Sequence, residues 1–274
     1  MTTPNSTATV ASLFQTAATD GFDPTALAVV NVTNFNQTIA AAIGTTTLDD
    51  IDASNVVLVT LVLDDSSSIE SANNTDNVIA GANLVLDAIA ASKEDGIFVM
   101  VTTLNAGVIC PITPLANAPR ISRANYNPNG YTPLYDTVAA TLGAVIAKTA
   151  DFSAGGVPVR SVTLIVTDGA DVGSTVHRKP EAVAPAIRAM VQSEQHIIGA
   201  MGIDDGSTDF RGVFTRMLNG LREVHSHKLL HLDLKPSNIY LRADNTPVLI
   251  DFGAARQTLH SDTPMLKPMY TPGF

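Results

Sequence analysis

Short apolar runs alternate with longer segments of helical period between residues 55 and 203. The apolar runs cover residues 56–63, 97–101, 161–167 and 196–203, and apolar positions recur at helical spacing over 78–89, 134–146 and 180–191. An apolar run bounded by turn-forming residues is typical of a strand that is buried on both faces of a parallel sheet. Strands alternating with helices predict an α/β fold, a doubly wound and mostly parallel sheet with helices on both faces.

The region before residue 55 is predicted to be an N-terminal extension, residues 1–54. Its first 20 residues are rich in Thr, Ala and Ser, and we expect their start to be poorly ordered. Asp23 followed by Pro24 indicates a helix start, and Gly44 indicates a helix end, so one helix is predicted over 24–43. We expect this helix to pack against the main domain.

Composition sets limits on the function. The chain has 274 residues, 45% of them hydrophobic, and a mean hydropathy of +0.20, which is enough for a buried core. A net charge of −10 argues against binding to nucleic acids or to anionic membranes. Cys110 is the only cysteine, which excludes an intramolecular disulfide and indicates a small apolar core residue. We see no secretion signal and no membrane-spanning run, and expect a cytoplasmic protein.

Candidate ligands for a metal ion follow the first apolar run. Asp64, Ser66 and Ser68 lie at spacing i, i+2, i+4, and oxygen ligands of this kind suit a hard cation such as Mg²⁺. Asp168 follows the run 161–167, and the carboxyl ends of parallel strands meet at one edge of the sheet. An alternative is that the serines only cap the next helix. We interpret the neighbouring Asp65 as a solvated loop residue.

Residues 55–215 resemble a von Willebrand factor type A domain with a metal-ion-dependent adhesion site. The family's D-x-S-x-S motif matches Asp64, Ser66 and Ser68, its loop threonine matches Thr132, and its T-D-G matches the sequence that contains Asp168. The resemblance implies a three-layer, Rossmann-like fold that holds one Mg²⁺, Mn²⁺ or Ca²⁺ ion. It implies that Ser66 and Ser68 ligate the ion directly, that Thr132 and Asp168 do so directly or through water, and that Asp64 holds the set together.

The same resemblance implies a function. In the family, a carboxylate of the binding partner completes the coordination of the cation. The first functional prediction is therefore a metal-dependent binding module that captures an Asp or Glu side chain of a protein partner, without chemistry. Nucleic acids and membranes are not expected partners.

A second resemblance covers about residues 218–274. His231-Leu232-Asp233 stands where protein Ser/Thr kinases have H-R-D, Lys235 and Asn238 follow at the family's spacing, and Asp251 begins D-F-G. The likeness implies that Asp233 orients the substrate hydroxyl, that Lys235 contacts the transferred phosphate, and that Asn238 and Asp251 bind the Mg²⁺ of ATP. Leu232 replaces the family's arginine, which puts control by activation-loop phosphorylation in doubt.

The charge distribution changes where this second part begins. Residues 216–274 carry 7 basic and 5 acidic side chains, in contrast to the acidic remainder, so a domain boundary is predicted near residue 216. No glycine-rich loop or ATP-lobe lysine precedes the catalytic loop, and no A-P-E motif follows it. The competing functional prediction is therefore a Ser/Thr protein kinase that is inactive without a further ATP-binding lobe. A third possibility is an inactive remnant that the first 215 residues do not need.

Overall fold

The computed structural model describes most of the first 203 residues and short pieces of the remainder. The described residues are 6–51, 53–92, 96–203, 222–223, 226–227, 229–230, 239–241, 247–249, 253 and 256–257. The chain divides into two compact units, residues 1–205 and 206–274. The division lies about ten residues before the boundary predicted from charge, and residues 1–54 belong to the first unit.

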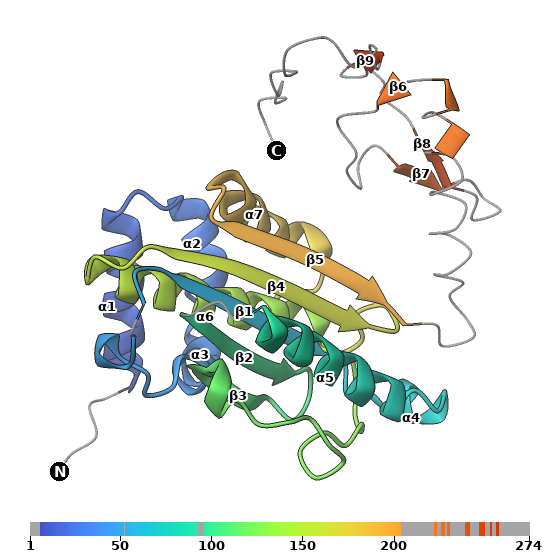
Figure 1. The fold of residues 1–274 in the computed structure, drawn as a ribbon, viewed down its shortest axis with the longest axis horizontal. Helices are drawn as coiled ribbons and strands as arrows, with labels where there is room; N and C mark the ends of the chain where they lie inside the picture. The colour runs from blue at the N-terminus through green and yellow to red at the C-terminus, as the bar shows by residue number, and fades with distance from the viewer. Residues whose placement is uncertain are drawn as a thin grey trace. The chain divides into compact units, whose positions relative to one another are not determined.

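The first unit is built on a five-stranded mixed sheet with the strand order β3-β2-β1-β4-β5 (Figure 1). The strands are β1 (Val56–Leu63), β2 (Ile97–Thr103), β3 (Val108–Pro114), β4 (Val159–Thr167) and β5 (His196–Gly202). Neighbouring strands pair in parallel except β3, which runs antiparallel to β2. The apolar runs therefore became the strands of an α/β fold, as predicted.

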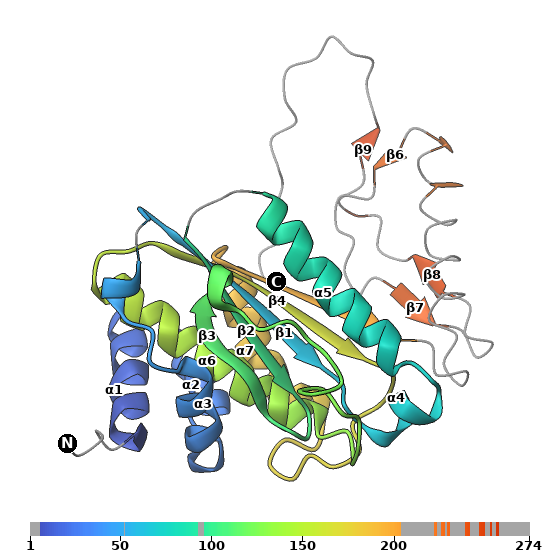
Figure 2. The same cartoon turned by 60° about the horizontal axis from the view of Figure 1, so that its bottom comes forward.

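Helices cover both faces of the sheet (Figure 2). They are α1 (Ser6–Thr19), α2 (Pro24–Val30), α3 (Asn36–Ile43), α4 (Ser67–Ser71), α5 (Thr75–Ala91), α6 (Leu134–Ala154) and α7 (Pro180–Gln192). Successive side chains of a strand point to opposite faces. Leu61 and Leu63 of β1 accordingly pack with α5, whereas Leu58 and Val62 pack in the core that α1, α2, α3, α6 and α7 share. Both faces of β1 are buried, which explains its uninterrupted apolar sequence.

The order of the strands fixes where a ligand site can form. The chain passes from β1 to β2 by way of α5 on one face, then returns to add β4 and β5 on the other side by way of α6 and α7 on the opposite face. The direction of winding reverses between β1 and β4. In open α/β sheets, ligands bind beyond the carboxyl ends of the strands at this point. Asp64 and Asp168 follow those two ends.

The N-terminal region contains a helix, α1, that the sequence did not predict. Val10, Phe14 and Ala17 are buried in it at helical spacing, while residues 1–5, at the start for which we expected poor order, lie outside the described part. The single predicted helix over 24–43 was also wrong. Helix α2 ends where the backbone N–H of Asn31 donates to Leu27 O. A 3-10 turn, Thr33–Phe35, then separates α2 from α3. The predicted ends are confirmed: Asp23 accepts from Thr25 N at 2.7 Å, and Gly44 has a φ of 66°.

In the second unit, the described residues form two small antiparallel pairs. They are β6 (Leu229–Leu230) with β9 (Arg256–Gln257), and β7 (Ile239–Leu241) with β8 (Pro247–Leu249). Over the described ranges, no single helix is long and apolar enough to cross a membrane, and one bent pair, Pro24–Val30 with Thr33–Asp50, passes by length and composition alone.

Candidate functional site at the carboxyl ends of β1 and β4

Asp64 is the buried centre of the site. Its side chain is inaccessible to solvent. Oδ1 accepts a hydrogen bond from the backbone N–H of Ser66 at 2.9 Å, and Oδ2 accepts one from Thr167 Oγ1 at 2.7 Å. The backbone N–H of Asp168 reaches the same Oδ2 at 3.4 Å. The carboxylate therefore joins the end of β1 to the end of β4.

The hydroxyls of Ser66 and Ser68 lie side by side, with their Oγ atoms 2.8 Å apart. Ser66 is the N-cap residue of α4, but its side chain makes no capping hydrogen bond to that helix. Ser66 therefore does not follow the alternative prediction, in which these serines only cap the next helix. The backbone turn that Asp64 stabilises instead brings the two hydroxyl oxygens close together.

Thr132 comes from a loop that lies against the serine turn. Gly130 and Ser67 hold the two segments together, because Gly130 N donates to Ser67 Oγ at 2.9 Å and Ser67 N donates to Gly130 O at 3.1 Å. Thr132 itself is 7% exposed and forms an antiparallel bridge with Val172. The sequence motifs that contain Asp64, Thr132 and Asp168 thus meet at one edge of the sheet, although about 100 residues separate the first from the last.

The burial of Asp65 differs from the prediction. We interpreted it as a solvated loop residue, but its side chain is 1% exposed. Oδ1 accepts from the backbone N–H of Asn105 at 2.7 Å, and Oδ2 accepts from that of Ala106 at 2.9 Å. A buried polar group is costly unless hydrogen bonds of this kind satisfy it. Asp65 therefore anchors the turn after β2, and no local sequence pattern indicated this because its partners are 40 and 41 residues away.

Tyr126 is a contributor that sequence reasoning missed. It is buried, and its hydroxyl donates to the backbone oxygen of Asp64. Burial, and then the negative charges of Asp65, Asp64 and Asp168, raise the pKa of this phenol, so the donor keeps its proton. A single tyrosine in a Pro- and Asn-rich loop carries no motif that would have identified it.

The residues present fit a hard divalent cation. Over the ranges that the structure describes, no group of three or more His, Cys, Asp or Glu side chains is arranged to hold a metal. A cation here would therefore depend mainly on hydroxyl oxygens, from Ser66, Ser68 and Thr132, with one carboxylate, Asp168. Oxygen-only ligands suit Mg²⁺, Mn²⁺ or Ca²⁺ and disfavour softer metals.

The structure does not describe the predicted kinase-type residues. Asp233, Lys235, Asn238 and Asp251 all lie outside the described residues. Their predicted roles as substrate-orienting, phosphate-contacting and Mg²⁺-binding groups stay predictions.

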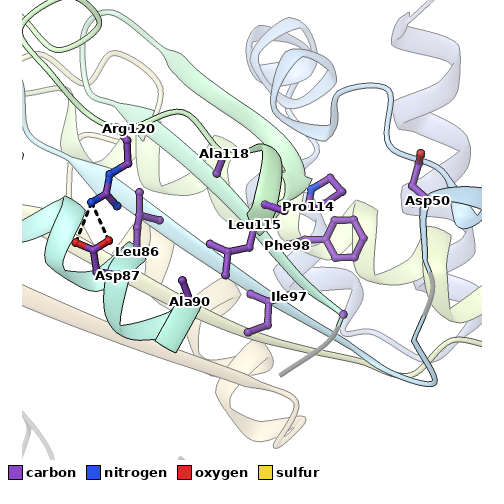
Figure 3. A pocket seen from close by; sticks show the side chains of 12 residues that line it. Asp50, Leu86, Asp87, Ala90, Ile97, Phe98, Pro114, Leu115, Ala118 and Arg120 are labelled. Carbon is purple, nitrogen blue, oxygen red and sulfur yellow. Dashed lines mark hydrogen bonds and ion pairs between the residues drawn. The ribbon is translucent and has the colours of Figure 1, made fainter. Parts of the chain in front are cut away.

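Another hollow of the first unit lies away from this site. It has a volume of about 750 Å³ between α5, β2 and the end of β3, and Figure 3 shows its lining, which includes Leu86, Ile97 and Phe98. Arg120 and Asp87 form an ion pair at 2.7 Å on its rim, and both side chains are more than half exposed. Exposed ion pairs contribute little energy. None of the predicted metal-site residues lines this cavity.

Comparison with known proteins gives a family only for the C-terminal part. The protein kinase domain model matches residues 191–274, which include the end of α7 and all of β5. The chain is 41% identical over 58 residues to Serine/threonine-protein kinase D of Synechocystis sp., and 48% identical over 50 residues to Serine/threonine-protein kinase PknA of Nostoc sp.. It is 48% identical over 46 residues to Stress-activated protein kinase jnk-1 of Caenorhabditis elegans.

The extent of these matches limits what they establish. They cover 21%, 18% and 17% of this chain, and 12%, 9% and 10% of the three relatives. The chain thus spans about a tenth of the length of the kinases it matches. The kinase resemblance of the C-terminal part is confirmed. None of these comparisons supports the von Willebrand-type resemblance of residues 55–215.

Proposed function

We propose that the first unit is a divalent-cation-dependent binding module for a carboxylate of a protein partner. The observation that carries this proposal is the pairing of Ser66 Oγ with Ser68 Oγ at 2.8 Å beside the buried Asp64. Ser66, Ser68, Thr132 and Asp168 would hold the cation, as the resemblance to the von Willebrand type A family implies. The bound cation would supply a positive charge for the incoming Asp or Glu.

The burial of the site supports this function. Asp64 and Asp168 are both nearly inaccessible to solvent, and a cation is attracted to a carboxylate more strongly in such a region of low dielectric than in water. Both oxygens of Asp64 already accept hydrogen bonds, so this residue would position the ligands without needing to bind the cation itself.

The test is thermal melting of the purified chain during titration with MnCl₂ or MgCl₂. A cation that binds only the native state stabilises it by about 2.7 kcal/mol at 100 times its Kd. We expect the shift to disappear in Ser68→Ala and to persist in Ser71→Ala, a serine of the same helix whose Oγ bonds to Ser67 O. Equal shifts in both variants, or no shift in the wild type, would contradict the proposal.

A second function concerns the C-terminal part, and the comparisons favour it over the first. The match to the protein kinase domain supports a Ser/Thr kinase catalytic segment that transfers phosphate from Mg²⁺-bound ATP. Asp233, Lys235, Asn238 and Asp251 would carry the reaction. Kinases also need a glycine-rich loop and an ATP-lobe lysine, which precede the catalytic loop. Here the described preceding residues form the α/β unit, so transfer would need an ATP-binding lobe that this unit does not provide.

This second function is tested by autophosphorylation with labelled ATP and by melting with Mg²⁺-ATP. Label incorporation or an ATP-dependent shift that Asp251→Ala abolishes would establish the kinase function. Asp244→Ala, an acidic residue of the same segment outside the motifs, is the matched control. Absence of both signals in the wild type would show that this segment does not bind ATP productively by itself.

A further inference from the structure

Asn105 contacts the candidate metal site from a third loop and belongs to none of the motifs above. It lies in the turn between β2 and β3, and it is exposed. Its backbone N–H donates to Asp65 Oδ1 at 2.7 Å, and its side-chain Nδ2 donates to the same oxygen at 3.1 Å. Nδ2 also donates to Tyr131 O at 2.7 Å. One side-chain amide therefore links the turn after β1 to the loop before α6.

The peptide bond between Tyr131 and Thr132 is held at both of its polar atoms. Its oxygen, Tyr131 O, accepts the hydrogen bond from Asn105 Nδ2. Its nitrogen, Thr132 N, donates to Val172 O at 2.8 Å. A peptide unit is planar, so these two bonds fix its orientation. Thr132 is thereby positioned relative to the loop after β4 through Val172, and relative to the turn after β1 through Asn105.

Gly130 allows Asn105 to approach this loop closely. Its φ is 113°, in the left-handed region that favours glycine, and a Cβ atom at this position would lie 2.7 Å from Asn105 Oδ1. Any other residue here would push the Asn105 amide away. Gly130 also exchanges two hydrogen bonds with Ser67. The residue before Tyr131 therefore contacts both the serine turn and Asn105.

The rigidity of this loop affects which cation the site can prefer. Mg²⁺ requires nearly ideal octahedral geometry with oxygen ligands at about 2.0–2.1 Å, whereas Ca²⁺ accepts distances of about 2.3–2.6 Å in a flexible arrangement. The expected ligands come from three separate segments: Ser66 and Ser68 from one, Thr132 from the second and Asp168 from the third. A displacement of Thr132 relative to the two serines would therefore reduce the affinity for Mg²⁺ more than the affinity for Ca²⁺.

We propose that Asn105 is a positioning residue that makes the candidate metal site prefer Mg²⁺ to Ca²⁺. This inference rests on the cation-binding function proposed above. Asn105 acts through the peptide bond before Thr132 and is not itself a ligand of the cation. In Asn105→Ala, Asp65 keeps the hydrogen bonds from the backbone N–H groups of residues 105 and 106. The turn after β1 is thus retained, and the variant loses the side-chain hydrogen bonds, including the one to Tyr131 O.

Calorimetric titration of the full chain with MgCl₂ and, separately, with CaCl₂ tests the proposal. The signal of this site is the part that Ser68→Ala abolishes. Asn105→Ala should weaken Mg²⁺ binding about fivefold, which corresponds to the loss of one neutral hydrogen bond. Its affinity for Ca²⁺ should change by less than about twofold, because Ca²⁺ tolerates a displaced ligand. A loss of fold stability alone would not change the ratio of the two affinities.

Asn83→Ala is the matched control. The Asn83 side chain also makes two long-range hydrogen bonds, since its Nδ2 donates to Ile121 O at 2.8 Å and its Oδ1 accepts from Ile121 N at 3.0 Å. This variant should lower the melting temperature and leave the ratio of affinities unchanged. Asn105 is exposed, so Asn105→Ala should fold as the wild type does, and thermal melting without added cation checks both variants.

Three results would overturn the proposal. Equal weakening of Mg²⁺ and Ca²⁺ binding in Asn105→Ala, with binding intact in the wild type, would leave the cation-binding function standing without this role for Asn105. The same change of ratio in Asn83→Ala would assign the effect to general loosening of the fold. Binding of neither cation by the wild type would contradict the cation-binding function and this inference together.

Discussion

Thr167 donates its side-chain hydroxyl to Asp64 Oδ2 at 2.7 Å, across 103 residues of sequence. This bond joins the last residue of β4 to the residue that follows β1. It lies where the winding of the sheet reverses, and it fixes the relative position of the two loops that carry the candidate metal ligands. The pair is therefore a structural precondition for that site.

The first prediction is that Asp64 and Thr167 are energetically coupled. Thr167→Val and Asp64→Asn should each reduce the free energy of unfolding, because a hydrogen bond to a buried charged group contributes about 1.5–3 kcal/mol. The double variant should lose less than the sum of the two single losses. Urea unfolding of the four proteins measures the coupling. Strictly additive losses would show that the two residues stabilise the fold independently.

The second prediction concerns acid stability. The folded pKa of His196 is about 4, below the ordinary value of 6.5, because the ring is buried. Between these pH values the unfolded chain binds a proton that the folded chain does not, so stability falls as pH decreases. The contribution of His196 alone amounts to about 2 kcal/mol between pH 7 and pH 5.

Urea unfolding at pH 7 and pH 5 tests this effect in His196→Asn. We expect a smaller loss of stability on acidification in this variant than in the wild type. His227→Asn removes an exposed histidine and should behave as the wild type does. The same pH dependence in all three proteins would show that His196 is not the group responsible.

The third prediction concerns a buried lysine. Lys148 is 2% exposed, and its Nζ donates to Thr46 O and to Asp151 Oδ2, 4.6 Å from the centre of the Phe152 ring. Lys148→Ala should cost about 3 kcal/mol, because it removes the packed alkyl chain and leaves Thr46 O without this donor. Lys148→Met keeps the packing and should cost about 1–2 kcal/mol. Equal losses would mean that the charge alone matters.

The fourth prediction concerns the edge of the sheet. Ile197 on the edge strand β5 is 65% exposed, and Met201 on the same strand is 49% exposed. Exposed apolar edge strands favour association. Ile197→Thr should change the free energy of unfolding by about 0.5 kcal/mol or less and raise the concentration at which light scattering begins. Leu58→Ala, a buried contrast in β1, should cost about 2–5 kcal/mol. A large loss in Ile197→Thr would show that Ile197 is covered in solution.

Strands β1 and β2 were predictable because their apolar runs are buried on both faces, whereas β4 and β5 were predictable from apolar runs that are partly exposed. The helix caps at Asp23 and Gly44 were also predictable, since capping depends on a few neighbouring residues. Helix α1 and the break after Val30 were not. Thr, Ala and Ser give α1 little local signal, and its stability comes from packing Val10 and Phe14 into the shared core.

The candidate metal site was likewise predictable from the sequence only in part. The sequence by itself placed Asp64, Ser66, Ser68, Thr132 and Asp168 at strand ends or in loops, because the motif spacing and the alternation of strands and helices are local features. It also identified the kinase resemblance of the C-terminal part. Only the tertiary structure decided that Asp65 is buried and that Tyr126 supports Asp64. Those relationships arise from contacts between residues far apart in the chain, and no local pattern encodes them.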